Sequence, residues 1–549
     1  MAPKGWTVRA IDLYAGIGGW SLGLRLAGVE VVASYEWWQP AIDTHNGNHG
    51  GDIKPVDIRQ LRLADLPADI DLVVGSPPCT EFSYANRGGS GDIVEGLKDL
   101  VKFLEVVRHL KPRYWALENV PRVAELLRSG LKDPKHALYR FRELNPQIEV
   151  VDFSDHGAPQ SRRRCIAGNI PFGLIAGYRR HLPKPTLGDV VEAMAGKDSI
   201  IDPVWGVTLP PSQLTETEAE APLNAEELRM NSEAKSFHPV YNNMAFPDPL
   251  DAPSRTVTAT CTRVSRESIV IADPMVEGRY RRLTIRERAS LQGFPITYQF
   301  YARSFAEKAK MIGNAIPPTF TYLVACAAME VTGEAFRPFN EAARTLKLPA
   351  TPAPVTAPDT EGRTYPARRG FRAAIPGLRF KSGMRFDLSN QVEGTDVDWR
   401  VRFFFGPSKD VREVDLDGSV LQDLRRELAG PEFSGFRAKL VKAEAELGKS
   451  SPCSLQDRWT HRAAGLGPYE VVDLLGDLAA DLIDLLEANM SDPAAAERFV
   501  CKVADSAPGR GPTPGLRKLE RNATPVLAGL IIGDWFNTLS WHADRRAAA

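Results

Sequence analysis

The chain has 549 residues, of which 43% are hydrophobic and 25% charged, and its formal net charge is −1. This length exceeds one ordinary hydrophobic core, so two or three domains are expected in a soluble globular protein. The balanced charge excludes a uniformly basic nucleic-acid binder, although local arginine clusters can still meet phosphate. No run of about eighteen apolar residues predicts a membrane span. Met1–Trp6 lacks the apolar core of a signal peptide, which indicates a cytoplasmic protein.

The first part of the chain alternates short apolar runs with amphipathic stretches. Strands are predicted at residues 8–14, 29–35, 71–75, 114–117, 148–153 and 164–168, and helices at residues 19–27, 94–109 and from residue 40. Strands that are apolar throughout and alternate with helices imply an α/β fold, in which both faces of a doubly wound, mostly parallel sheet are covered. Ligands of such sheets bind beyond the carboxyl ends of the strands.

Residues 172–275 interrupt this alternation, because they are rich in proline, glutamate and threonine and show few clear periods. Helical patterning returns at residues 284–291, 305–311 and 318–330. We therefore expect a core of residues 1–171, a small irregular domain of residues 172–275 and a returning part of the core at residues 276–336.

A separate region follows a linker, which is expected at residues 337–370 because residues 348–366 have the Pro, Ala and Thr content of an extended spacer. Residues 371–549 are expected to form an α+β domain with strands at 384–388 and 398–405. An amphipathic helix is predicted at 469–490, and its apolar face fits the domain's own core better than a partner. That face comprises Val472, Leu475, Ala479, Leu482 and Leu486.

A glycine-rich turn follows the first predicted strand and comprises Tyr14, Ala15, Gly16, Ile17, Gly18 and Gly19. Glycines let the backbone approach a ligand closely, and the next helix N-terminus favours negative charge; a plain tight turn is the alternative. The second strand ends at Glu36 and Trp37, where a carboxylate can accept hydrogen bonds from ribose hydroxyls and an indole can cover an adenine ring. The carboxylate of Asp57, which precedes Ile58, can accept from an exocyclic amine.

Cys79 differs from the other five cysteines in its position just after a buried strand. No pair of cysteines has the C-x-x-C spacing of a zinc site, so we expect no metal, and scattered cysteines are typical of a reduced protein. Pro77 and Pro78 stiffen the backbone before Cys79, and a glycine-rich stretch follows at residues 88–91. This arrangement favours a nucleophile beside a closing loop over an inert buried thiol.

Two polar motifs lie at further strand ends: Glu118-Asn119-Val120 and residues 160–164, Gln-Ser-Arg-Arg-Arg. An acid at a helix N-terminus and a solvated basic run are the ordinary alternatives. Other arginines cluster at residues 179–180 and 279–288. These clusters are compatible with phosphate contacts and equally with ordinary solvated surface.

Taken in order, these motifs resemble those of the cytosine-5 DNA methyltransferase family. The resemblance continues through residues 282–287, 291–295 and 313–318 and covers roughly residues 8–332. It implies that the glycine-rich turn, Glu36, Trp37 and Asp57 form the pocket of the cofactor S-adenosyl-L-methionine. The same pocket would include Ile58, Pro78, Asn314 and Ala315.

The resemblance also implies a catalytic set. Cys79 corresponds to the nucleophile, Glu118 to the acid beside the base, and Arg162 and Arg164 to the arginines that serve the catalytic site. The irregular domain corresponds to the target-recognition domain, and residues 254–260 to its threonine-rich segment.

The family's reaction explains why these residue types are needed. A thiolate added to carbon-6 of cytosine makes carbon-5 able to attack a sulfonium methyl. Arg162 or Arg164 supplies the positive field that ionises Cys79, and Glu118 stabilises the proton on nitrogen-3. No motif identifies the base that removes the carbon-5 proton. The target base has to leave the duplex, so the expected partner is double-stranded DNA.

Three departures from the family pattern concern loop closure and DNA contact more than the nucleophile. Thr80 stands where many relatives have glutamine, Tyr14 replaces phenylalanine, and residues 92–96 do not align with the common D-x-R-G segment.

Two other functions compete with DNA methylation. A tRNA or other RNA cytosine-5 methyltransferase is disfavoured by the roughly hundred-residue insert, which suits groove reading in a duplex. A non-catalytic DNA-binding regulator is disfavoured by the intact set of Cys79, Glu118 and Arg164. The resemblance implies a location in the bacterial cytoplasm or nucleoid. It leaves the biological role open between restriction-modification, defence, regulation by a solitary methyltransferase and phage-encoded modification. For residues 371–549, three roles stay open: dimerisation, contact with DNA, and contact with a restriction or defence partner.

Overall fold

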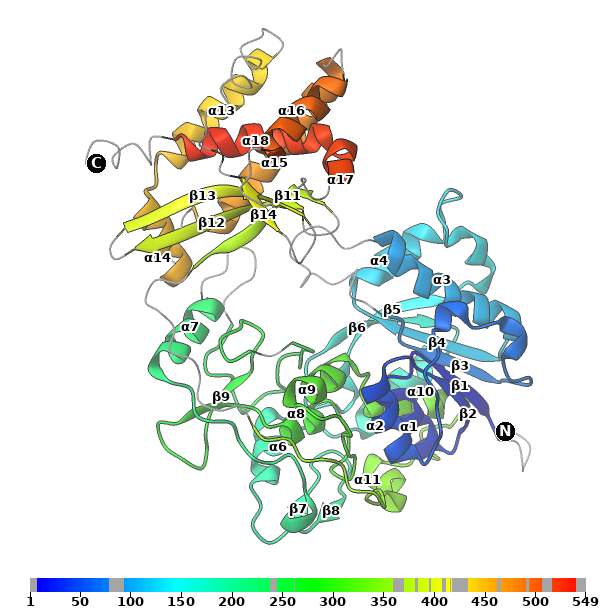
Figure 1. The fold of residues 1–549 in the computed structure, drawn as a ribbon. Helices are drawn as coiled ribbons and strands as arrows, with labels where there is room; N and C mark the ends of the chain where they lie inside the picture. Colours follow the sequence, from blue (N-terminus) through cyan, green and yellow to red (C-terminus); the bar gives the residue numbers. More distant parts are fainter. Residues whose placement is uncertain are drawn as a thin grey trace. The chain divides into compact units, whose positions relative to one another are not determined.

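The computed structural model describes residues 7–78, 93–236, 244–260, 262–358, 370–380, 384–393, 396–406, 411–414, 416, 433–461, 466–489, 493–505 and 516–539. The chain divides into two compact units, Met1–Arg363 and Thr364–Ala549 (Figure 1). Each unit has its own hydrophobic core.

The first unit is built on a six-stranded sheet in the order β2-β1-β3-β4-β6-β5. The strands are β1 (Arg9–Leu13), β2 (Glu30–Tyr35), β3 (Leu72–Gly75), β4 (Tyr114–Asn119), β5 (Gln147–Asp152) and β6 (Arg163–Gly168). Strands β2, β1, β3 and β4 are parallel, whereas β6 is antiparallel to both of its neighbours. The prediction of a mostly parallel sheet is confirmed. The reversed direction of β6, the strand next to the edge strand β5, is an addition that strand periodicity does not reveal.

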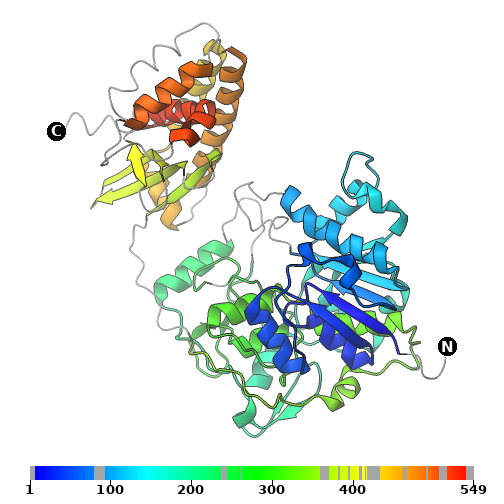
Figure 2. The same cartoon turned by 45° about the vertical axis from the view of Figure 1, so that its right-hand side comes forward.

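Alternate residues of the strands supply two cores, one on each face of the sheet. Ala10 of β1 belongs to the core shared with α1 (Gly19–Ala27) and α10 (Pro318–Ala328). Ile11 belongs to the core shared with α3 (Ile93–Leu110) and α4 (Arg122–Gly130). Figures 1 and 2 show these helices covering opposite faces, which explains why the strands are apolar on both sides.

The remaining helices around this sheet come from residues 39–60, 139–156 and 285–342 of the first unit. They are α2 (Gln39–His49), α8 (Ile285–Leu291), α9 (Phe305–Asn314) and α11 (Phe339–Ala342), with short 3-10 turns η1 (Ile58–Gln60), η3 (Tyr139–Leu144) and η4 (Phe153–His156). Helix α8 begins at Thr284, because Thr284 and Glu287 exchange side-chain and backbone hydrogen bonds in a capping box. By length and composition alone, the stretch Phe305–Ala328 could cross a membrane, but 89% of its most apolar window is buried inside the structure, as in a core helix.

The irregular region contains more helix than its sequence pattern predicts: α5 (Phe172–Tyr178), α6 (Leu187–Met194) and α7 (Ala225–Ser236). It also contains the pair β7 (Ile200–Ile201) with β8 (Thr208–Leu209), and its last strand, β9 (Val270–Ala272), pairs with β10 (Tyr280–Arg282) just beyond residue 275.

Buried ion pairs hold this region together and tie it to the residues that follow it. Arg263 pairs with Glu227 at 2.6 Å, and Arg282 pairs with Glu220 at 2.5 Å, with all four side chains at most 9% exposed. The arginine cluster at 279–288 is therefore largely internal. Burial lowers the pKa of Arg286 to about 10. Arg282 and Arg286 are buried, so they neither contact phosphate nor form solvated surface.

The segment expected to be a spacer packs on the first unit as far as Thr356. The backbone N–H and the hydroxyl of Thr356 donate to the two carboxylate oxygens of Glu216, at 2.9 and 2.8 Å. The same carboxylate accepts from the buried ammonium group of Lys308 at 2.7 Å.

The second unit is a four-stranded antiparallel sheet packed against helices. Its strands, in sheet order, are β11 (Arg372–Arg379), β12 (Arg385–Glu393), β13 (Asp396–Phe405) and β14 (Arg412–Val414). Its helices are α13 (Ser434–Leu447), α14 (Pro452–His461), α15 (Pro468–Asn489), α16 (Pro493–Asp505), α17 (Leu516–Arg521) and α18 (Ala523–Asn537). The predicted apolar face of α15 is buried in this unit's own core, so the interpretation as a core helix is confirmed.

Candidate active site

The motifs meet at one edge of the first unit's sheet. Leu13 of β1 pairs in register with Tyr35 of β2 and with Gly75 of β3, and Gly75 pairs with Leu117 of β4. The segments that leave these four parallel strands therefore begin side by side, at the edge where ligands of such sheets bind.

The glycine-rich turn has a left-handed backbone at Tyr14, Gly16 and Gly18, with φ of 56°, 53° and 87°. A Cβ atom on Gly18 would lie 2.5 Å from Nε2 of His49, so this position has to be glycine. A Cβ atom on Gly16 would meet nothing within 4 Å. The turn is thus packed tightly against α2 at Gly18 and open at Gly16.

The Glu36 carboxylate ties the end of β2 to this turn. One oxygen accepts from the Gly16 N–H at 2.8 Å, and the other accepts from the N–H groups of Trp37 and Trp38, both at 2.9 Å. The Trp37 side chain is 66% exposed, which leaves its indole face accessible. Asp57 is drawn near because the Val56 N–H donates to the Glu36 carbonyl, and Asp57 then caps η1 while Ile58 is buried.

The end of α9 lies against the start of α1. A Cβ atom on Gly19 would lie 2.3 Å from the Ile316 carbonyl oxygen, and the Thr321 hydroxyl donates to the Gly19 carbonyl at 2.8 Å. Asn314, at the last position of α9, is exposed, and Ala315 follows it half-buried. Residues that are about 300 positions apart in the sequence therefore meet at the glycine-rich turn.

The segment before Cys79 is held by two side chains. The Trp20 indole donates to the Ser76 hydroxyl at 3.0 Å, and the Asn119 amide donates to the Pro77 carbonyl at 3.0 Å. Pro78 is the last described residue of this segment, and it is exposed. The expected nucleophile, Cys79, lies outside the described residues, as does Thr80.

Glu118 and Arg164 form an ion pair, with 3.1 Å between Nε and the carboxylate. The two side chains are 7% and 15% exposed. Strand pairing explains the contact, since Glu118 of β4 lies opposite Ile166 of β6, two residues along from Arg164 on the same face.

Arg162 makes different contacts. It is 2% exposed, and its guanidinium donates to the carbonyl oxygens of Val257 at 2.9 Å and Gly313 at 2.8 Å. The structure therefore brings Arg164, and not Arg162, into an ion pair with Glu118.

Asp152 and Gln160 hold the loop that carries Arg162. The sequence motifs did not single out Asp152, and Gln160 was assigned no role of its own within the motif at residues 160–164. The Asp152 carboxylate accepts from the Arg162 N–H at 2.9 Å and from the Ser161 hydroxyl at 2.7 Å, and these hydrogen bonds with those of Ser154 lower its pKa. The fully buried Gln160 amide bonds to Gln292 at 2.6 Å. In the sequence, only its position near the end of the strand predicted at residues 148–153 sets Asp152 apart from other aspartates.

The described cysteines of the first unit are poor nucleophiles. Burial raises the pKa of the Cys165 thiol to about 12, and that of Cys326 likewise to about 12. A thiol with such a pKa is almost wholly protonated near neutrality.

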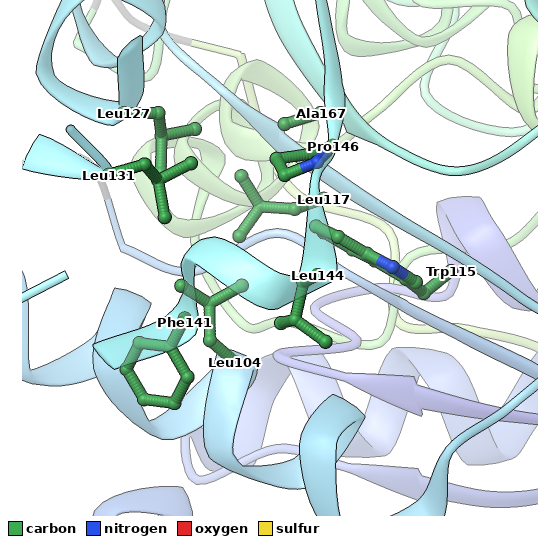
Figure 3. A pocket seen from close by; sticks show the side chains of 9 residues that line it. All are labelled: Leu104, Trp115, Leu117, Leu127, Leu131, Phe141, Leu144, Pro146 and Ala167. Atoms are coloured by element: carbon green, nitrogen blue, oxygen red, sulfur yellow. The ribbon is translucent and has the colours of Figure 1, made fainter. Parts of the chain in front are cut away.

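A small pocket in the α3–α4 core does not qualify as the site. Figure 3 shows that apolar side chains line it: Leu104, Trp115, Leu117, Leu127, Leu131, Phe141, Leu144, Pro146 and Ala167. It contains none of the predicted site residues and no charged group to orient a cofactor. Within the described part of the chain, no group of three or more His, Cys, Asp or Glu side chains is arranged to hold a metal ion.

Comparison with known families identifies the first unit. The sequence model of the family of C-5 cytosine-specific DNA methylases matches residues 8–329. This match covers more than half of the chain, so the protein belongs to this family and is a DNA cytosine-5 methyltransferase.

Curated relatives are Type II methyltransferases. M.HindV of Haemophilus influenzae is 29% identical over 339 residues, which are 60% of this chain and 99% of that protein. M.MthTI of Methanothermobacter thermautotrophicus is 28% identical, with 56% and 92% covered, and M.FnuDI of Fusobacterium nucleatum is 27% identical, with 58% and 93% covered.

Solved structures with similarity include the Dnmt2 methyltransferase of S. pombe, with a TM-score of 0.43 and 18% identity, and a prophage DNA modification methyltransferase of E. coli, with 0.40 and 20%. Each match covers 59% of this chain and 99% of the other.

Proposed function

We propose that this methyltransferase moves a methyl group from S-adenosyl-L-methionine to carbon-5 of a flipped-out cytosine in a specific duplex sequence, through a covalent adduct with Cys79. The observation that carries the proposal is the hydrogen bond from Asn119 to the Pro77 carbonyl. It joins the segment that leads to Cys79 to the strand end that bears Glu118, and Glu118 in turn pairs with Arg164. The Type II relatives support a role in restriction-modification, and defence or phage modification would use the same chemistry.

The residues at the sheet edge fit the cofactor. The open space at Gly16 admits a ligand close to the backbone, and the exposed Trp37 indole offers a face for adenine. Glu36 and Asp57 offer carboxylate oxygens to ribose hydroxyls and an exocyclic amine, and Asn314 adds an exposed amide. Bound there, the cofactor would supply an electrophilic sulfonium methyl group.

The chain's own side chains then act on the cytosine. The Cys79 thiolate forms a bond to carbon-6, and Glu118 holds a proton at nitrogen-3 as electron density builds on the ring. Arg164 holds the Glu118 carboxyl in place. After carbon-5 is methylated, its proton leaves to a base, and the sulfur departs with the electron pair of the bond to carbon-6.

The test is a transfer assay with tritium-labelled S-adenosyl-L-methionine and either unmethylated duplex DNA or tRNA. We expect label on DNA, none on tRNA, and none on DNA with Cys79→Ala. The exposed Cys453 of the second unit provides the matched control, and Cys453→Ala keeps the activity. Bisulfite sequencing of the labelled DNA then locates the target cytosine.

Label on tRNA alone would replace the proposal with an RNA methyltransferase. Cofactor binding without transfer to DNA of many sequences would favour a DNA-binding regulator.

A further inference from the structure

Arg162 connects two parts of the molecule that serve different ligands in the proposed function. Its Nη1 donates to the carbonyl of Val257, inside the threonine-rich segment of residues 254–260. Its Nη2 donates to the carbonyls of Gly313, at 2.8 Å, and Ala315, at 3.4 Å. These two residues flank Asn314. One buried guanidinium therefore bridges the proposed DNA-recognition segment and the proposed cofactor segment.

A second bridge runs parallel to the first. The Val257 N–H donates to the Gln160 side-chain oxygen at 2.6 Å, so both polar groups of the Val257 backbone are held from the same loop. The Gln160 amide donates to Gln292, and the Gln292 amide donates to the Ala315 carbonyl. Both bridges thus end at the same carbonyl beside Asn314.

The two bridged segments also touch directly, and the contact continues to the cofactor turn. A Cβ atom on Gly313 would lie 2.3 Å from the Thr258 carbonyl carbon, so α9 and the threonine-rich segment pack backbone to backbone. Beyond Ala315, the Ile316 carbonyl abuts Gly19 of the glycine-rich turn. Close-packed backbone transmits a displacement, because it has no void in which to absorb the shift.

We propose that Arg162 is a positioning residue that couples binding of duplex DNA at the threonine-rich segment to the affinity of the cofactor pocket. This inference rests on the proposed function and gives Arg162 a role apart from the Arg164–Glu118 pair. A planar guanidinium reaches both segments at once, whereas an ammonium group is a single point charge on a flexible stem. Arg162→Lys keeps the charge and loses the bridge.

The test measures the dissociation constant of S-adenosylhomocysteine, which cannot donate a methyl group, with the full-length protein. Titrations are run without DNA and with a saturating duplex that contains the mapped target cytosine. We expect DNA to tighten binding at least about fivefold in the wild type, and less than about twofold in Arg162→Lys, within the range of ordinary coupling energies. Because coupling between two ligands is reciprocal, S-adenosylhomocysteine has to tighten DNA binding by the same factor, and Arg162→Lys has to lose the same share of that effect.

Two further variants separate coupling from folding. Arg163, the next residue and the first of β6, is exposed, and Arg163→Gln keeps the full coupling. Gln160→Glu weakens the second bridge, and we expect it to reduce the coupling in part. This variant tests the proposal if Arg162→Lys does not fold. For each variant, a melting curve measured by circular dichroism establishes the folded state.

Unchanged coupling in folded Arg162→Lys would overturn the inference, and so would a wild type that methylates DNA with no coupling at all. A wild type that neither binds S-adenosylhomocysteine nor methylates DNA would instead contradict the proposed function.

Discussion

Asp12 lies completely buried beneath the glycine-rich turn, and its carboxylate accepts from the Ser21 hydroxyl at 2.7 Å. Burial raises the pKa of Asp12 from 3.8 to about 7. The folded state therefore holds a proton that the unfolded state releases between these pH values. Stability contributed by this group falls as pH rises from about 4 to about 7, because ionisation favours the unfolded chain.

Asp12→Asn mimics the protonated acid and removes this dependence. The free energy of unfolding of the variant, minus that of the wild type, increases between pH 5 and pH 7 by at most about 1.4 kcal/mol per pH unit. Urea unfolding of both proteins at several pH values measures the difference. Burial lowers the pKa of His45 to about 3. His45 is present in both proteins, so its contribution to the free energy of unfolding cancels in the difference between them. A difference independent of pH would show that Asp12 is ionised when folded.

Glu118 gives a second prediction at the residue scale. Glu118→Gln removes the proton-holding group while its shape stays, so kcat falls by about 10²–10⁴, the usual contribution of a positioned acid. The affinity for S-adenosylhomocysteine stays within twofold or so of the wild type, since the contacts of Glu118 are with Arg164. Steady-state kinetics and a binding titration measure the two quantities. A rise in KM with unchanged kcat would contradict the assigned role.

Residue types at strand ends could be predicted from the sequence, but long-range partners could not. Glu118 and Arg164 follow from motif order, and their pairing follows from the strand register. The partners of Arg162 lie 95 and 151 residues further along the chain, where no local pattern records them. Arginines that serve a site and arginines that tie backbone segments together look alike in a sequence.

At the scale of elements, α1 and α10 are packed unusually closely. A Cβ atom on Gly23 of α1 would lie 2.1 Å from the Thr321 hydroxyl and 2.4 Å from the Tyr322 backbone nitrogen. Gly23→Ala therefore lowers the free energy of unfolding by about 1–3 kcal/mol through overpacking. Gly173 of α5 is the matched control, because its Cβ would meet nothing within 4 Å.

Gly173→Ala is expected to raise the free energy of unfolding by about 0.5–1 kcal/mol, as a helical glycine in open space should. Thermal melts compare both variants with the wild type. Equal effects of the two substitutions would contradict the close packing of α1 on α10.

Elements with clear periodicity were predictable, and elements ordered by ion pairs were not. The helix expected at residues 19–27 begins and ends there, and the apolar face expected for α15 is buried. Helix α7 was missed because most of its residues are polar, its few apolar ones show no clear helical period, and it is held by pairs such as Arg263–Glu227. Partners of this kind become neighbours only after folding, so apolar spacing contains no record of them.

At the scale of the whole molecule, the two units have separate cores, and relatives are covered almost to their full length by about three fifths of this chain. We therefore predict two transitions in calorimetry of the full-length protein. We also predict that residues 1–363 alone bind S-adenosylhomocysteine and methylate DNA. A single cooperative transition, or an inactive but folded first unit, would make the second unit part of the catalytic machinery.

The most direct measurement of the central claim is trapping of the protein on duplex DNA with 5-fluorocytosine at the target position, in the presence of S-adenosyl-L-methionine. Fluorine on carbon-5 cannot leave as a proton does, so the bond between the nucleophile and carbon-6 persists through denaturation. We predict a denaturant-stable complex whose cross-linked peptide contains Cys79, formed equally by Cys453→Ala and absent from Cys79→Ala. A complex that persists in Cys79→Ala, or no complex with a wild type that methylates the unmodified duplex, would contradict the account.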